Sequence, residues 1–152
     1  MSSSLKGKVV VVTGGTQGLG RGIAVHLAGT GAAGIVVCGR NRENGAAAER
    51  EVRAAGCPCV YVSADLVHEE ECRQVVRRCD RQFGRLDGLV NAAGITDRGG
   101  LEDTSVALWD LLFAVNVRAP FILMQEAVRV MKREGRGGSV VNVVSRSSHG
   151  GQ

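Results

Sequence analysis

The sequence predicts an α/β domain built on a doubly wound parallel sheet, and three observations support this fold class. Short, wholly apolar runs alternate with longer amphipathic segments, which is the pattern of βαβ units. Aromatic residues make up 3% of a chain that is 44% apolar, so the core must consist of Val, Leu, Ile and Ala, as buried parallel strands do. The length of 152 residues suits one compact domain.

Five strands are expected, at residues 9–12, 35–38, 60–62, 86–90 and 139–144. Helices are expected at residues 18–28, 43–55, 68–83 and 106–132, and Gly56 has the character of a C-terminal cap. Pro120 falls inside the last helix, where it predicts a kink. Right-handed crossovers predict the strand order 3-2-1-4-5, with helices on both faces and the sheet truncated after the fifth strand.

Composition excludes several classes of partner. The net charge is +4 and the pI about 9.0, but arginines alternate with acidic residues and no basic run carries stacking aromatics, so no nucleic-acid partner is expected. No stretch approaches a membrane span, and the N-terminus lacks a signal sequence, so no membrane partner is expected. The five cysteines are expected to be reduced, in the cytoplasm. Cys57 and Cys59 lack a second pair, so no metal site is expected.

A glycine-rich turn with the sequence T-G-G-T-Q-G-L-G, residues 13–20, joins the first strand to the first helix. Gly14 allows a tight turn, Gly18 lets the backbone approach a pyrophosphate, and Gly20 allows the helix to pack closely on the strand. The free N–H groups and positive end of the helix then face the phosphates. The turn predicts a dinucleotide-binding, Rossmann-type fold, and no Lys-Ser or Lys-Thr pair follows it, which excludes a P-loop. A glycine turn without a ligand is the alternative.

Five motifs in this order resemble the short-chain dehydrogenase/reductase family, over Lys8 to Gly150. The glycine turn is followed by Asp65-Leu66, Asn91-Ala92-Ala93-Gly94, Asn116 in the long helix, and Asn142-Val143-Val144-Ser145. The resemblance implies that residues 1–152 are a single dinucleotide-binding domain, incomplete at its C-terminus. It also implies an NAD(P)-dependent oxidoreductase that transfers hydride between nicotinamide and a carbonyl or alcohol substrate, and a homo-oligomer for the complete protein.

The expected cofactor-binding residues follow strands, whose carboxyl ends meet at one edge of a parallel sheet. They are Gly14, Thr16, Gln17, Gly18, Leu19, Gly20, Arg40, Asn41, Asp65, Leu66, Asn91, Ala92 and Gly94. Arg40 follows the second strand, where a guanidinium suits a 2′-phosphate, so NADP(H) is expected in preference to NAD(H). A solvated surface charge is the alternative for Arg40. Gln17 departs from NADP-dependent relatives, which often carry a basic residue at this place.

The resemblance implies two catalytic residues, Asn116 and Ser145. Ser145 would hydrogen-bond the substrate oxygen and stabilise developing charge, and a turn-capping serine is the alternative. Asn116 would open the helix locally and hold a water in a proton relay. A buried amide that bridges backbone groups is the alternative, and both can hold. Trp109 is expected to pack on the buried face of the long helix.

The family's Tyr-x-x-x-Lys pair has no counterpart in the sequence. Tyr61 is the only tyrosine, and Asp65 lies four residues beyond it. We therefore expect the chain alone to be inactive and to be a fragment of an active reductase. The alternative is a naturally short protein that binds a cofactor or a partner without catalysis. The identity of the substrate and the direction of the reaction are not predicted.

Overall fold

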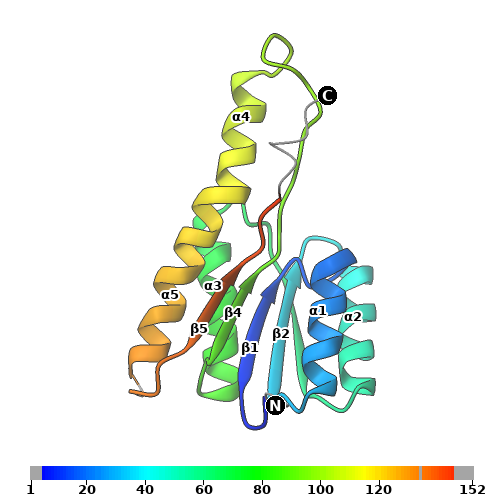
Figure 1. Cartoon of the computed structure of the whole chain (residues 1–152), viewed down its shortest axis with the longest axis vertical. Coiled ribbons are helices and arrows are strands. Elements are labelled where there is room, and N and C mark those ends of the chain that lie inside the picture. The colour runs from blue at the N-terminus through cyan, green and yellow to red at the C-terminus, as the bar shows by residue number, and fades with distance from the viewer. Residues whose placement is uncertain (1–4, 134, 146–152) are drawn as a thin grey trace.

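The computed structural model describes residues 5–133 and 135–145, and a five-stranded parallel sheet forms its centre (Figure 1). The strands are β1 (Val9–Thr13), β2 (Gly34–Gly39), β3 (Cys59–Ser63), β4 (Gly88–Asn91) and β5 (Ser139–Asn142). The helices are α1 (Gly18–Gly29), α2 (Arg42–Ala54), α3 (Glu69–Phe83), α4 (Val106–Phe113), η1 (Ala114–Arg118) and α5 (Ala119–Arg133). The strand order is β3-β2-β1-β4-β5, which confirms the predicted topology.

The central strand β1 is buried on both faces, which explains its unbroken apolar run. Successive side chains of a strand point to opposite faces of a sheet. Val9 and Val11 accordingly belong to the core under α3 and α5, whereas Val10 and Val12 belong to the core under α1 and α2. Figure 1 shows these two helix pairs on opposite sides of the sheet, so helices cover both faces, as expected for a doubly wound fold.

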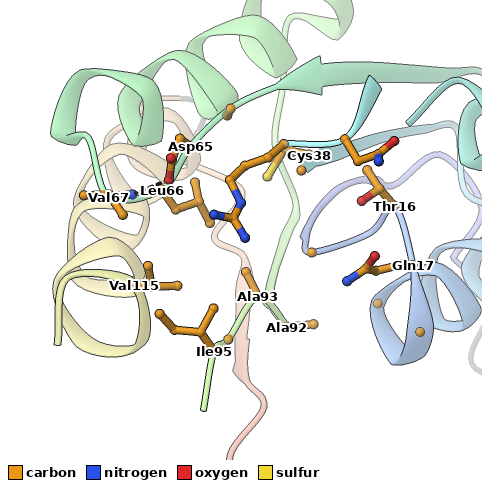
Figure 2. A pocket seen from close by; sticks show the side chains of 18 of the residues that line it. Thr16, Gln17, Cys38, Asp65, Leu66, Val67, Ala92, Ala93, Ile95 and Val115 are labelled. Carbon is orange, nitrogen blue, oxygen red and sulfur yellow. Dashed lines mark hydrogen bonds between the residues drawn. The ribbon is translucent and has the colours of Figure 1, made fainter. Parts of the chain in front are cut away.

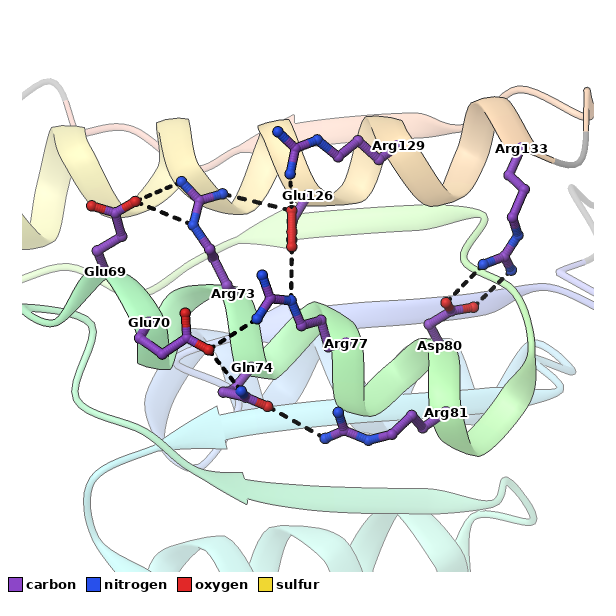
Figure 3. Close-up of polar contacts among 10 residues, drawn as sticks. All are labelled: Glu69, Glu70, Arg73, Gln74, Arg77, Asp80, Arg81, Glu126, Arg129 and Arg133. Atoms are coloured by element: carbon purple, nitrogen blue, oxygen red, sulfur yellow. Dashed lines mark hydrogen bonds and ion pairs between the residues drawn. The ribbon is translucent and has the colours of Figure 1, made fainter.

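Helices α3 and α5 are joined by buried and exposed ion pairs as well as by apolar packing (Figure 3). The carboxylate of Glu126 on α5 is 8% exposed, and it lies 2.9 Å from Nε of Arg77 and 3.6 Å from a terminal nitrogen of Arg73 on α3. Near the other end of α3, Arg133 pairs with Asp80 at 2.8 Å. These contacts fix α5 against α3 and thereby against the sheet.

The long helix predicted over residues 106–132 is broken, but the break precedes Pro120. Residues Ala114–Arg118 form a π-helical turn, in which the N–H of Ala119 donates to the carbonyl of Ala114, five residues back. Pro120 has no N–H to donate to the carbonyl of Asn116, so the competing α-helical bond is lost at this place. The irregularity is therefore an inserted turn that contains Asn116.

The helical stretch Val106–Arg133 also corrects the expectation that no segment is long enough to span a membrane. It has 28 residues and a mean hydropathy of 1.6 over its most apolar 18-residue window, which suffices by length and composition alone. Part of this apolar content is used in the core, where Ile122, Leu123 and Ala127 pack against α3 and the sheet. Only 28% of that window is buried in the described structure, and length and composition alone are weak evidence for a membrane span.

Trp109 is not on a buried face, so that expectation is wrong. Its side chain is 55% exposed and stacks on Phe113, with ring centroids 4.6 Å apart. The reason is the position of α4, which extends beyond the carboxyl ends of the strands, where no sheet lies beneath it (Figure 1). A helix pattern alone does not indicate that its apolar face has run past the core.

Candidate functional site

A cavity of about 720 Å³ opens where the chain leaves the carboxyl ends of β1, β2, β3 and β4 (Figure 2). This edge is where open α/β sheets bind ligands, and the volume is in the range of cofactor sites. All but one of the residues predicted to bind cofactor line it. These are Gly14, Thr16, Gln17, Gly18, Leu19, Gly20, Arg40, Asn41, Asp65, Leu66, Ala92 and Gly94.

The turn after β1 depends on Gly14, whose φ of +65° is a left-handed conformation that favours glycine. A Cβ at this position would also lie 2.8 Å from the Cα of Ala93, which follows β4. The turn therefore lies directly against the segment after β4. The close approach brings two walls of the cavity together and leaves no room for a side chain at Gly14.

Gly18 and Gly20 serve different purposes in the same turn. Gly18 has a φ of +51°, and a Cβ there would meet no atom within 4 Å, so its backbone faces open space beside the cavity. A Cβ on Gly20 would lie 2.3 Å from the carbonyl oxygen of Gly14. The close packing expected at Gly20 thus involves the turn itself rather than the strand before it.

The N-terminus of α1 lies at the cavity, which Gly18, Leu19 and Gly20 line, and it has no side-chain cap. Its N-cap residue, Gln17, makes no side-chain capping bond within the described ranges, and the first turn of α1 carries no acidic residue. Uncapped N–H groups and the positive end of the helix dipole together favour an anion. The arrangement suits the pyrophosphate of a dinucleotide.

Thr13 is a site residue that the motif contained but the prediction did not single out. Its side chain is buried, and Oγ1 accepts hydrogen bonds from the N–H groups of Ala92 and Ala93, each at 3.2 Å. The hydroxyl therefore ties the end of β1 to the segment after β4. This contact holds the glycine turn and the opposite wall of the cavity at a fixed separation.

The end of β2 places a charged side chain, Arg40, and a neutral one, Cys38, at the cavity. Arg40 is exposed at the cavity, whereas Cys38 is fully buried, and burial raises the pKa of its thiol to about 12. Gly39 leaves room for Thr16, since a Cβ there would lie 2.4 Å from the Thr16 hydroxyl oxygen. Arg40 is thus the cationic group that this strand brings to the cavity.

The segment after β3 is held in place by groups that the sequence did not indicate. The N–H of Asp65 donates to Glu71 at 2.6 Å, and Oδ1 of Asp65 accepts from the N–H of Val67 at 3.1 Å. Arg118, from η1, donates to the carbonyl of Val67 at 2.8 Å. The carboxylate of Asp65 is thereby fixed at the wall of the cavity, where the family resemblance expects the adenine ring.

The predicted catalytic residues and Asn91 lie outside the cavity lining. Asn116 is exposed, and its carboxamide bonds the backbone of Ile95 through both its oxygen and its nitrogen. The alternative of an amide that bridges backbone groups therefore holds, although the amide is not buried. Nδ2 of Asn91 donates to Oδ1 of Asn142 at 2.8 Å and so links β4 to β5. Ser145 follows β5 and is exposed.

Several lining residues were not predicted. Some are neighbours of predicted ones, such as Ala64, Val67 and Ala93. Leu111 and Val115 come from α4 and η1, far along the chain, and enter the lining through tertiary packing. No local pattern marks these two, because any apolar helix position looks the same in sequence.

The sheet order, the glycine turn between β1 and α1, and the cavity at the carboxyl edge together define a domain of the Rossmann type. The family model for short chain dehydrogenases matches residues 8–152. The chain belongs to this family of oxidoreductases.

Individual relatives agree with this assignment. An uncharacterized oxidoreductase of Thermotoga maritima is 38% identical over 144 residues, covering 95% of this chain and 56% of that relative. A metagenomic short-chain oxidoreductase in complex with NADP superposes with a TM-score of 0.87 and 38% identity, covering 94% of this chain and 64% of that one. An NADH-dependent reductase complexed with NAD has a TM-score of 0.87 and 28% identity, covering 100% and 65%. The chain thus spans less than two thirds of the length of each of these three relatives.

Proposed function

We propose that this chain provides the NADP(H)-binding part of an oxidoreductase that acts on a small-molecule carbonyl or alcohol. The observation that carries the proposal is the cavity at the carboxyl edge of the sheet, with the glycine turn on one side and Arg40 beside it. When bound, the nicotinamide supplies or accepts the hydride, and the protein's task is to hold and orient it.

The residues of the cavity fit a dinucleotide. The open backbone at Gly18 and the uncapped N-terminus of α1 would receive the pyrophosphate. Asp65 and Leu66 line the wall after β3 and would contact the adenine. Ala92 and Gly94, after β4, place no large side chain on their part of the opposite wall and would lie along the cofactor toward its nicotinamide end.

Arg40 supports NADP(H) as the preferred cofactor. The two solved relatives described above bind NADP and NAD respectively, so the preference has to be argued from this chain. A carboxylate at the end of β2 would favour the free ribose hydroxyl of NAD(H), but the chain has Gly39, Arg40 and Asn41 there. A guanidinium pairs well with a phosphate, and the ribose 2′-position of NAD(H) offers only a hydroxyl in its place.

The preference is tested by measuring the affinity of the chain for NADPH and NADH in the Arg40→Ala variant, with Arg42→Ala as the matched control. Arg42 is also exposed but does not line the cavity. Loss of the charged contact should weaken NADPH binding by about tenfold and leave NADH binding nearly unchanged. The control, Arg42→Ala, should change neither the affinity for NADPH nor the affinity for NADH. Equal or tighter binding of NADH by the unsubstituted chain would rule the preference out.

We further propose that Ser145 and Asn116 serve the reaction in the complete enzyme, and that residues 1–152 alone do not turn over substrate. Tyr61 is a poor candidate for the proton donor, because its hydroxyl donates to the carbonyl of Gly39 at 2.8 Å. The chain incubated with NADPH and simple ketones or aldehydes should show no oxidation of NADPH. Sustained turnover would refute this part of the proposal.

Association between copies of the chain is a further part of the proposal. Trp109, Phe113, Val117 and Phe121 are each between 46% and 55% exposed, and they lie on α4, η1 and α5. Apolar side chains gathered in this way favour contact with another subunit. Light scattering of the purified chain should give a mass above that of a monomer, and Phe121→Glu should reduce this mass.

We also propose a reducing, cytoplasmic location, which the five buried free cysteines support.

A further inference from the structure

Gln17, in the glycine turn, is linked to Asn44, in the first turn of α2. Nδ2 of Asn44 donates a hydrogen bond to Oε1 of Gln17 at 3.3 Å. The two residues are 27 positions apart in the sequence, and only Gln17 lines the cavity. Asn44 therefore acts on the site through the side chain of Gln17, without lining it.

In this hydrogen bond the acceptor end of the Gln17 carboxamide faces Asn44, which leaves the other end for the cofactor. A carboxamide carries an acceptor oxygen at one end and a donor NH₂ group at the other. Because the oxygen is directed to Asn44, the nitrogen is directed into the cavity, as Figure 2 shows for Gln17. The turn thus presents a neutral hydrogen-bond donor, where the opposite orientation would present an acceptor.

The backbone of Asn44 is held at the start of α2. Its backbone N–H donates to Oδ1 of Asn41 at 2.9 Å, which caps the N-terminus of α2. Asn41 lines the cavity beside Arg40. The start of α2 and the glycine turn are therefore linked into one frame around the place where the end of β2 would meet the cofactor's ribose.

We propose that Asn44 is a positioning residue for cofactor discrimination, which turns the NH₂ group of Gln17 toward the 2′-phosphate of NADP(H). This inference rests on the proposed preference for NADP(H). A phosphate accepts hydrogen bonds and repels an amide oxygen, so the orientation set by Asn44 adds a donor to the charge of Arg40. It explains how a turn that lacks a basic residue next to Gly18 still favours the phosphorylated cofactor.

The test is a double-mutant cycle with Asn44→Ala and Gln17→Ala, followed by titration of the 152-residue chain with NADPH and NADH. Asn44→Ala should weaken NADPH binding by about threefold to tenfold and change NADH binding less than twofold, as expected for one hydrogen bond. In the Gln17→Ala background the same substitution should have no effect on either affinity, because the side chain it orients is gone.

A second variant, Asn44→Asp, keeps the size of the side chain but removes its donor and adds a negative charge, whose direct repulsion of the phosphate is the part of the effect that remains when Gln17 is replaced. A carboxylate only accepts, so it would turn the nitrogen of Gln17 away from the cavity and its oxygen inward. The loss of NADPH affinity should exceed that of Asn44→Ala, and it should shrink when Gln17 is also replaced. Thermal unfolding of each variant shows whether the fold is retained.

The outcomes separate the two claims. Equal binding of NADPH and NADH by the unsubstituted chain would contradict the proposed cofactor preference. A clear preference for NADPH that Asn44→Ala leaves unchanged would contradict the inference alone. An equal loss of affinity with and without Gln17 would also contradict it, because Asn44 would then act by a route other than Gln17.

Discussion

The carboxamide of Asn116 makes two hydrogen bonds to the backbone of Ile95. Its oxygen accepts from the N–H of Ile95 at 2.9 Å, and its nitrogen donates to the carbonyl of the same residue at 2.8 Å. Ile95 lines the cavity, and Asn116 lies in the π-helical turn η1. The irregular turn in the long helix is thus connected directly to the wall of the candidate site.

Removing the two hydrogen bonds between Asn116 and Ile95 should destabilise the fold and make the cavity wall less ordered. Asn116→Ala eliminates both hydrogen bonds and should lower the free energy of unfolding by about 1–2 kcal/mol. The matched control is Val117→Ala, since Val117 is 55% exposed and belongs to the same turn. Urea denaturation measures the free energy of unfolding of both variants. If Asn116→Ala and Val117→Ala lower it equally, the hydrogen bonds of Asn116 do not stabilise the turn.

Two glycines of α1 should respond in opposite directions to the same substitution. Gly20→Ala would place a Cβ 2.3 Å from the carbonyl oxygen of Gly14, so the turn must shift. A loss of about 1–3 kcal/mol in stability is expected, together with weaker cofactor binding. Gly22→Ala meets no atom within 4 Å and should stabilise the helix by about 0.4–1 kcal/mol. Thermal unfolding separates the two, and destabilisation by both would argue against the described packing of the turn.

The ion cluster between α3 and α5 should matter more than pairs on the surface. Glu126 is buried and pairs with Arg73, Arg77 and Arg129 (Figure 3), so Glu126→Ala leaves those arginines without their shared carboxylate. A cost of about 1–2 kcal/mol is expected, because Arg73 and Arg77 lose a buried partner but keep Glu69 and Glu70, and Arg129 is exposed.

The matched control for this cluster is Glu51→Ala. Glu51 pairs with Arg21, but its side chain is 45% exposed. Exposed pairs contribute at most about 1 kcal/mol, so the control should change the unfolding free energy little. Equal effects of the two substitutions, measured by chemical denaturation, would show that burial of Glu126 adds nothing.

Asp87 should make stability depend on pH in acid. Burial tends to raise its pKa, but hydrogen bonds from Arg85 and the N–H of Val9, with the charge of Lys8, outweigh burial and lower the pKa below the ordinary 3.8. The unfolded chain therefore takes up this proton at a higher pH than the folded chain does. The stabilisation is complete above the ordinary pKa and is lost as the pH falls through the lowered value.

The measurement for Asp87 is the unfolding free energy as a function of pH for the natural chain and for Asp87→Asn. The variant should be less stable near neutral pH, where the carboxylate is charged and paired. The difference should narrow as the pH falls below the ordinary pKa of 3.8, because the natural chain then loses its advantage. A difference that stays constant down to strongly acidic pH would contradict the role given to Asp87.

The order of the strands and most residues of the site could be predicted from the sequence, because the signals are local. The glycine turn follows its strand directly, and Arg40, Asp65 and Ala92 each follow a strand whose end must reach the same edge. The predicted strand order alone therefore places the glycine turn, Arg40, Asp65 and Ala92 at one edge of the sheet.

The features that were missed depend on contacts between distant segments. The family resemblance expected the helix to open at Asn116, and the π-helical turn lies there, but helix periodicity alone did not indicate it, because the bonds of Asn116 to Ile95 join positions 21 residues apart. Trp109 fits an apolar helix pattern, and its exposure follows from where α4 lies relative to the sheet. Asn91 carries a motif, but its side-chain direction is set by Asn142 on the neighbouring strand.

The central claim is that the cavity at the carboxyl edge of the sheet binds a dinucleotide. The most direct test is a titration of the ¹⁵N-labelled chain with NADPH, followed by its backbone amide resonances. We expect saturable shifts at Gly18, Arg40, Asp65 and Gly94, which line the cavity, and none at residues of the opposite edge such as Gly56. Unchanged resonances at these four positions with excess NADPH, or shifts confined to other parts of the chain, would contradict the claim.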